Sequence, residues 1–255
     1  EPAMTAARPA VVYHLAGLAH VGRSWEEPAE YLRVNAGGTL AVLEAARRCD
    51  SAPRVVVVSS AEVYGRVTAD QLPLDEDAPV RPVSPYAASK AAAEVVAVQA
   101  HLGHGLEVVV ARPFNHIGPG QSPTFVVPAL AGRILEARRT AAPVLAVGNL
   151  SPRRDFTDVR DIVRAYRLLA VAGQAGEVYN VCSGRDVAVE EVLRRLLVLA
   201  GLEVAVRPDP DLVRAVDVPV LVGDGSKLRA ATGWEPTVAL DATLAAVLES
   251  MAGGG

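Results

Sequence analysis

Short runs of β-branched residues alternate with longer stretches of helical periodicity in the first half of the chain. The runs at 11–16, 54–59 and 106–112 are apolar almost throughout, which predicts buried β-strands. The stretches at 28–49 and 84–102 carry apolar residues near helical spacing and predict two helices. Near-continuous apolar strands separated by helices are typical of a parallel sheet covered on both faces. Because such crossovers are right-handed, we expect an α/β fold with a doubly wound parallel sheet.

The second half of the chain is less regular. A segment rich in Gly, Pro and Asn predicts a loop at 114–124, and the arginine-rich stretch around 153–156 predicts another. Asp158 is placed to cap the helix that begins beside it. The remaining expected elements are helices at about 124–139, 158–171, 187–199 and 237–251, and strands at 144–147 and 177–181. No long linker separates two halves, so a smaller second α/β domain is expected to be interleaved with the first.

The sequence lacks a glycine-rich turn after its first strand. A doubly wound nucleotide-binding domain normally opens with such a strand and turn, which admit a pyrophosphate to a helix N-terminus. Gly17, Gly22, Gly37 and Gly38 do not give that spacing, and the chain begins within a few residues of what should be a middle strand. We therefore expect a Rossmann-like sheet without its first βαβ unit, in a fragment of a longer protein. Such a fragment is expected to bind a dinucleotide weakly and to self-associate through its open edge.

The composition narrows the function classes. Hydrophobic residues make up 51% of the 255 residues and charged residues 21%, as in a folded globular protein. No apolar run reaches the roughly 18 residues of a membrane span, and no signal peptide is visible. The net charge of −4 argues against nucleic acid as a partner. Cys49 and Cys182 are too few for a disulfide framework and the histidines have no partner at metal spacing, so a cytoplasmic protein without a metal is expected.

Tyr86 and Lys90 form the strongest chemical signal, in the stretch SPYAASK. Their spacing of four puts both side chains on one face of the predicted helix. The chain has only six tyrosines and two lysines, so a chance match to this spacing is expected about 0.05 times. An ammonium beside a phenol should lower the pKa of that phenol, which would make Tyr86 an acid or base near neutrality.

Polar residues follow the predicted strands at their carboxyl ends, where a parallel sheet faces its ligand. Ser60 could hydrogen-bond a reacting carbonyl or alcohol, and Glu62 could move a proton. Gly17 would let a ligand approach the backbone closely, while His14 beside it is expected to be structural. The arginines in the stretch RRDF suit phosphate oxygens, but a solvated charge cluster is an equal reading of that stretch.

Together these motifs resemble the extended short-chain dehydrogenase/reductases that act on nucleotide sugars. The resemblance covers nearly the whole chain. Within this superfamily, the chain is most similar to the GDP-6-deoxy-4-keto-mannose reductases and GDP-mannose 4,6-dehydratases. The residues that carry it are HLAG at 14–17, SSAEVYG at 59–65, SPYAASK at 84–90, RPFNHIGPGQ at 112–121, RRDFTDVRD at 153–161 and VYNVCSG at 178–184.

The resemblance implies a role for each matching residue. Tyr86 would exchange a proton at the sugar C4 oxygen, Ser60 would orient that oxygen, and Glu62 occupies the place of the acid that serves water elimination in the dehydratases. NAD or NADP would be held by Leu15, Ala16, Gly17, Ser59, Tyr86, Lys90 and Pro113. The nucleotide sugar would be contacted by Asn115, Asn149, Arg154 and Arg214, with the arginines near its diphosphate.

The resemblance also implies an activity and a domain layout. Residues 1–121 with about 156–182 would form the cofactor-binding domain, and about 122–155 with 183–255 the nucleotide-sugar domain. The expected reaction is reduction of the C4 ketone of GDP-4-keto-6-deoxy-mannose to GDP-rhamnose with NAD(P)H. The alternatives are a GDP-mannose 4,6-dehydratase or related epimerase/dehydratase, and a non-catalytic fragment that binds the GDP-sugar. A homodimer through the helices at 27–49 and 84–102 is expected.

Overall fold

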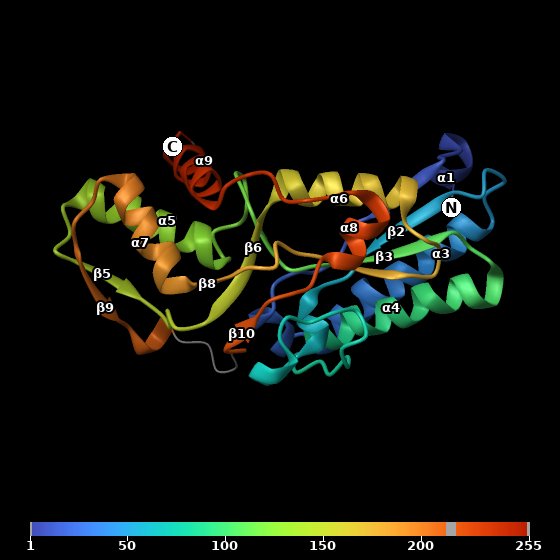
Figure 1. Cartoon of the computed structure of the whole chain (residues 1–255), viewed down its shortest axis with the longest axis horizontal. Coiled ribbons are helices and arrows are strands. Elements are labelled where there is room, and N and C mark those ends of the chain that lie inside the picture. Colours follow the sequence, from blue (N-terminus) through green and yellow to red (C-terminus); the bar gives the residue numbers. More distant parts are fainter. Residues whose placement is uncertain (1, 213–217, 254–255) are drawn as a thin grey trace.

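The computed structural model describes residues 2–212 and 218–253. The molecule is elongated, with a parallel sheet and its helices at one end and a smaller group of helices and strands at the other (Figure 1). The strand β6 (Arg153–Asp158) runs between the two ends (Figure 1).

The larger end is built on four parallel strands in the order β1-β2-β3-β7. These are β1 (Val11–His14), β2 (Arg54–Val58), β3 (Val108–Pro113) and β7 (Val178–Val181). The register pairs Val12 with Val55 and Val56 with Val109. The predicted parallel sheet is therefore confirmed. β1, β2 and β7 lie within the ranges that their apolar runs predict, and β3 extends one residue beyond its predicted range, to Pro113.

Helices cover both faces of this sheet because alternate strand residues point to opposite sides. Val57 and Val110 pack against α3 (Gly38–Arg47) and α4 (Pro85–His104), while Val109 packs against α6 (Val159–Ala172). Figure 1 shows α6 on one side of the sheet and α3 and α4 on the other. This arrangement is the doubly wound layering expected from the sequence.

The helix predicted at 28–49 consists of three segments. α2 (Pro28–Tyr31) continues into a π-helical turn at Leu32–Gly37 before α3 begins. Inside that turn, the Asn35 side chain accepts from Leu18 N at 2.8 Å and donates to Ser89 Oγ at 2.8 Å. A π-helical turn inside a helix redirects one side chain, and here it aims Asn35 at the turn after β1.

The smaller end contains α5 (Val126–Thr140), α7 (Val189–Ala200) and α9 (Leu240–Ala252). Their buried apolar residues share one cluster, which includes Ile134, Leu196 and Leu244. The parallel pair β5 (Val144–Val147) and β9 (Ala205–Pro208) closes this end. The two-domain layout and its boundaries stay a prediction.

Two predicted loops contain strands. The segment 114–124 includes β4 (Asn115–Ile117), and the arginine-rich stretch belongs to β6 (Arg153–Asp158). β4 pairs with β6, which also pairs with β10 (Val220–Leu221) and, antiparallel, with β8 (Asp186–Ala188). The loop prediction was correct for 118–124 and wrong for 115–117 and for the arginine-rich stretch. It failed there because pairing with partners distant in sequence forms these strands, whose local composition is polar.

The N-terminus of α6 is capped by Asp158, as predicted. The Asp158 side chain accepts a hydrogen bond from Arg160 N at 2.8 Å. None of the described helices is long and apolar enough to cross a membrane. The short elements are α1 (Pro2–Ala7), α8 (Ser226–Thr232) and the 3-10 turns η1 (Gly22–Trp25), η3 (Ala61–Tyr64), η4 (Ala69–Gln71) and η5 (Pro210–Leu212).

Candidate active site

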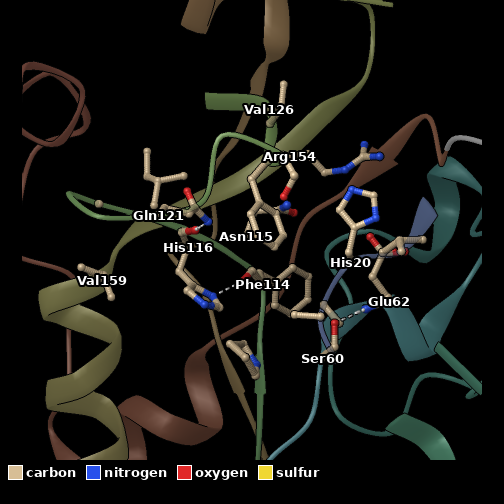
Figure 2. Close-up of a pocket in the computed structure, with 18 of the residues that line it drawn as sticks. His20, Ser60, Glu62, Phe114, Asn115, His116, Gln121, Val126, Arg154 and Val159 are labelled. Carbon is tan, nitrogen blue, oxygen red and sulfur yellow. Dashed lines mark hydrogen bonds between the residues drawn. The ribbon is translucent and has the colours of Figure 1, made fainter. Parts of the chain in front are cut away.

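A cavity of about 910 Å³ opens at the carboxyl ends of β2 and β3. Its walls come from η3, the first turns of α4, the strands β4 and β6, and α6. Figure 2 shows polar side chains from several of these segments turned into one space. Ligands of open α/β sheets bind at this edge, so the cavity is the natural candidate for the site.

Tyr86 and Lys90 both line this cavity from the first two turns of α4. The Ser84 hydroxyl caps the helix by accepting from Ala87 N at 3.1 Å, which fixes the turn that carries Tyr86. Lys90 Nζ donates to Val58 O at 2.7 Å, at the end of β2. Tyr86 packs edge-on against Tyr31, with 6.4 Å between ring centroids.

Burial controls the protonation of both groups. It raises the pKa of Tyr86 to about 12, although a hydrogen bond with Ser60 counteracts part of that rise. It lowers the pKa of Lys90 to about 8, although the nearby Glu94 carboxylate opposes that shift. The expectation of a lowered phenol pKa is therefore wrong for this structure, because burial outweighs the hydrogen bond with Ser60 and the nearby Glu62 carboxylate raises the pKa further. At neutral pH, Tyr86 keeps its proton and Lys90 is mostly charged.

Ser60 and Glu62 lie on the same side of the cavity (Figure 2). Ser60 caps η3, and its hydroxyl accepts from Glu62 N at 3.2 Å. A strand that ends in a capped 3-10 turn thus presents a hydroxyl and a carboxyl group to the same space. The sequence prediction that these two residues join Tyr86 and Lys90 agrees with this geometry.

Most of the residues expected to bind the cofactor line the cavity, where a ligand could come close to the backbone. Leu15, Gly17, Ser59 and Pro113 line the cavity, whereas Ala16 is not part of its wall. A Cβ at Gly17 would lie 2.8 Å from Asn35 Oδ1, so only glycine leaves that space open. The Ser59 hydroxyl is buried and has no hydrogen-bond partner within the described residues. These features fit a dinucleotide that supplies its own hydrogen-bonding groups.

Three of the four residues expected at the nucleotide sugar line the cavity: Asn115, Asn149 and Arg154. Arg154 is only 9% exposed, and its Nη1 donates to Val218 O at 2.7 Å. It therefore belongs to a strand rather than to a solvated loop. Arg214 lies outside the described residues.

Sequence reasoning missed several cavity residues. Gln121 and His116 come from the segment after β3, and His20 follows β1 (Figure 2). Gln121 Nε2 donates to His116 O at 3.0 Å, while its buried Oε1 has no partner in the described part of the chain. The motif NHIGPGQ contained His116 and Gln121, but only the fold, in which the β4 strand that includes His116 pairs with β6, places them at the cavity.

The surroundings of His14 and of the other potential metal ligands bear on two further predictions. His14 is buried, and its Nε2 lies 3.0 Å from Thr39 Oγ1, which suits the structural role expected for it. Within residues 2–212 and 218–253, no group of three potential ligands could hold a metal ion.

A tyrosine and a lysine one helical turn apart, beside a serine at the carboxyl edge of a parallel sheet, define an enzyme of the short-chain dehydrogenase/reductase class. The chain matches the family model described as GDP-mannose 4,6 dehydratase over residues 1–247, and it belongs to that family.

Curated relatives agree with this assignment. The chain is 38% identical over 241 residues to the GDP-6-deoxy-D-mannose reductase of Pseudomonas aeruginosa, covering 94% of this chain and 79% of that protein. It is 35% identical to a dTDP-glucose 4,6-dehydratase of Streptomyces niveus, covering 89% of this chain and 66% of the relative. The GDP-mannose 4,6-dehydratase of Yersinia enterocolitica is 28% identical over 92% of this chain and 70% of its own length.

Solved structures confirm the fold. RMD from Pseudomonas aeruginosa, complexed with NADPH, superimposes with a TM-score of 0.90 at 38% identity, covering 95% of this chain and 81% of that one. The UDP-glucose 4-epimerase of Thermus thermophilus, complexed with NAD, gives a TM-score of 0.87 at 32% identity, covering all of this chain and 81% of that one. These neighbours hold the two cofactors that the sequence predicts.

Proposed function

We propose that the protein reduces the C4 ketone of GDP-4-keto-6-deoxy-mannose to GDP-rhamnose with NAD(P)H. The observation that carries this proposal is the cavity in which a protonated Tyr86 lies with Ser60 and Lys90. Ketone reduction needs an acid in its protonated form, and burial keeps Tyr86 in that form. The reductase among the relatives, at 38% identity, supports the same reaction.

NAD(P)H, held by the cofactor residues of the cavity wall, would supply the hydride that C4 of the sugar receives. As the C4–oxygen double bond opens, Tyr86 donates its phenolic proton to that oxygen, which becomes the C4 hydroxyl. The Ser60 hydroxyl holds the oxygen in place for this transfer. The Lys90 ammonium stabilises the negative charge that develops on the tyrosine oxygen, and solvent returns a proton to Tyr86 afterwards.

The nucleotide part of the substrate is assigned to other residues of the same cavity. Arg154 would place a guanidinium near the diphosphate, with Asn115 and Asn149 beside it. Leu15, Gly17, Ser59 and Pro113 would contact the cofactor, and Ala16 and Arg214 keep their expected roles as proposals.

A GDP-mannose 4,6-dehydratase is the second candidate. Glu62 favours it, because a carboxyl group in the cavity could move the proton during loss of water from C5 and C6. The match to the dehydratase family model supports this candidate as well. A chain that binds GDP-sugar without turnover is the third candidate.

Mass analysis of two incubations separates these candidates. With GDP-4-keto-6-deoxy-mannose and NADPH or NADH, a reductase yields a product with two more hydrogens and consumes the reduced cofactor. With GDP-mannose and NAD, a dehydratase yields a product that has lost one water. Turnover of neither, with GDP binding retained, would leave the binding function alone.

We infer that the protein forms a homodimer in the cytoplasm. Exposed apolar residues on the outer face of α4 support the dimer, among them Val95 (69% exposed) and Leu102 (78% exposed). α3 lies beside α4 on this side of the molecule (Figure 1). Cys49 and Cys182 are both free, which suits a reducing compartment.

A further inference from the structure

Three buried polar side chains form a continuous row directly behind the candidate site: Tyr64, Arg112 and Glu94. Arg112 Nε and Nη2 donate to the two carboxylate oxygens of Glu94 at 2.8 and 2.7 Å. Arg112 Nη1 donates to the Tyr64 hydroxyl at 3.0 Å. The side chains of Arg112 and Glu94 are 6% and 7% exposed, and Tyr64 is 1% exposed. A buried ion pair is costly to form, so its presence here calls for a role beyond stability.

Further contacts hold the row in a single geometry. The Tyr64 hydroxyl donates to Asn180 Oδ1 at 2.7 Å. Arg112 Nη1 also donates to Glu76 O at 3.2 Å, and its guanidinium lies 5.1 Å from the centre of the Tyr64 ring. A planar guanidinium with partners on several sides has little freedom to rotate.

Each member of the row belongs to an element that carries a site residue. Glu94 lies on α4, one turn beyond Lys90 and two turns beyond Tyr86. Arg112 lies on β3, next to Pro113. Tyr64 ends η3, the short turn that Ser60 caps and that contains Glu62. The row therefore connects the two elements that present the acid and the hydroxyl to the cavity.

We propose that Tyr64, Arg112 and Glu94 are positioning residues that fix η3 relative to α4, and so fix Ser60 relative to Tyr86. None of the three lines the cavity, which separates them from the residues that touch substrate. This inference rests on the proposed function, because Ser60 and Tyr86 must meet the same substrate oxygen. A displacement of even 1 Å in such a pair can reduce a rate about 10²-fold.

Tyr64→Phe is the sharpest test of the row. It removes one hydroxyl and leaves the Arg112–Glu94 pair and the packing of the ring beside Phe114 in place. Tyr179→Phe is the matched control, since Tyr179 is also buried and its hydroxyl accepts one hydrogen bond, from Gln174 N at 3.0 Å, away from the cavity wall. For Tyr64→Phe we expect kcat to fall about tenfold with KM nearly unchanged, and for Tyr179→Phe no change in either.

A spectroscopic measurement tests the positioning without turnover. The full chain has six tyrosines, so labelling their Cζ atoms with carbon-13 gives few enough signals to follow, and Tyr86→Phe identifies the signal of Tyr86. Tyr64→Phe is expected to shift that signal and Tyr179→Phe to leave it in place. Glu94→Asp, which keeps the charge but shortens the reach to Arg112, is a second variant with the same expected changes.

The two measurements distinguish failure of the inference from failure of the proposed function. A wild-type chain that does not reduce the ketone contradicts the proposed function, while the Tyr86 signal still decides the positioning role. The inference is wrong, and the row is only structural, if Tyr64→Phe and Glu94→Asp change neither the Tyr86 signal nor kcat more than the control Tyr179→Phe does.

Discussion

At the scale of single residues, Tyr86 is the group on which the proposed chemistry depends. Its phenol is buried in the cavity wall, and its pKa of about 12 keeps it protonated at neutral pH. Lys90 is the only described lysine in that wall, so the pair has no substitute there. The sequence could identify this pair from its spacing alone, but the direction of the Tyr86 shift required the burial that only the fold creates.

Tyr86→Phe keeps the ring and its packing against Tyr31 while removing the proton. We expect kcat for ketone reduction to fall about 10²–10⁴-fold, because that range is typical of a general acid. Circular dichroism and GDP binding should be unchanged. Tyr13→Phe, at a half-exposed position outside the cavity wall, is the control and should keep full activity. Near-normal turnover of Tyr86→Phe would remove this residue from the mechanism.

The pKa of Lys90 gives the pH dependence a definite sign. With a folded-state pKa of about 8, the ammonium is present below that pH and is lost above it. We expect kcat/KM to fall as pH rises through about 8, while Tyr86 stays protonated across the same range. A profile that stays flat up to pH ~9.5 would show that the charge of Lys90 is not needed.

The contribution of Lys90 to the free energy of unfolding should change with pH in the opposite direction to kcat/KM. The unfolded lysine keeps its proton up to about its ordinary pKa of 10.5, so between about 8 and 10.5 the unfolded state binds more protons than the folded state. The contribution of Lys90 to the stability of the folded state therefore rises with pH in that window. Thermal unfolding measured alongside the kinetics separates loss of the charge from loss of the fold.

At the scale of elements, the strands of the central sheet were predictable and the substrate side was not. A continuous apolar run such as Val108–Val110 predicts a buried strand, so β3 could be predicted from sequence alone. β6 contains two arginines and two aspartates, and it is a strand only because β4, β8 and β10 pair with it. The same strands carry Arg154 and His116 to the cavity, which is why their placement required the fold.

β6 also offers a matched pair of arginines, because successive strand residues point to opposite faces. Arg154 is buried at the cavity, whereas Arg153 pairs with Asp186 at a more exposed position. For Arg154→Ala we expect GDP to bind about 10- to 150-fold more weakly, which corresponds to the ~1.5–3 kcal/mol of a charged hydrogen bond. Arg153→Ala should leave GDP affinity nearly unchanged. Calorimetric titration with GDP decides, and equal affinities in both variants would exclude Arg154 from the diphosphate site.

At the scale of the whole molecule, the elongated shape leaves the outer face of α4 open (Figure 1). A groove on this face is lined mainly by apolar side chains, including Val80, Val95, Val98 and Leu102, and its lining also includes the buried Glu94 and Arg112. Contiguous apolar surface of this kind marks an interaction site more often than isolated exposed residues do. A second copy of the chain bound at this groove would contact α4 toward its C-terminus, while Tyr86 lies in the first turn of the same helix.

Leu102→Glu tests this interface directly. A charge at a position that is 78% exposed should not disturb the single chain, but it would be costly in the centre of an apolar contact. We expect light scattering to give twice 26.6 kDa for the wild type and 26.6 kDa for Leu102→Glu at micromolar concentration. Val171→Glu, at an 83% exposed position on α6 across the sheet, is the control and should remain dimeric. A wild-type chain of 26.6 kDa, or a Leu102→Glu variant that stays dimeric, would place the apolar face of α4 outside any dimer interface.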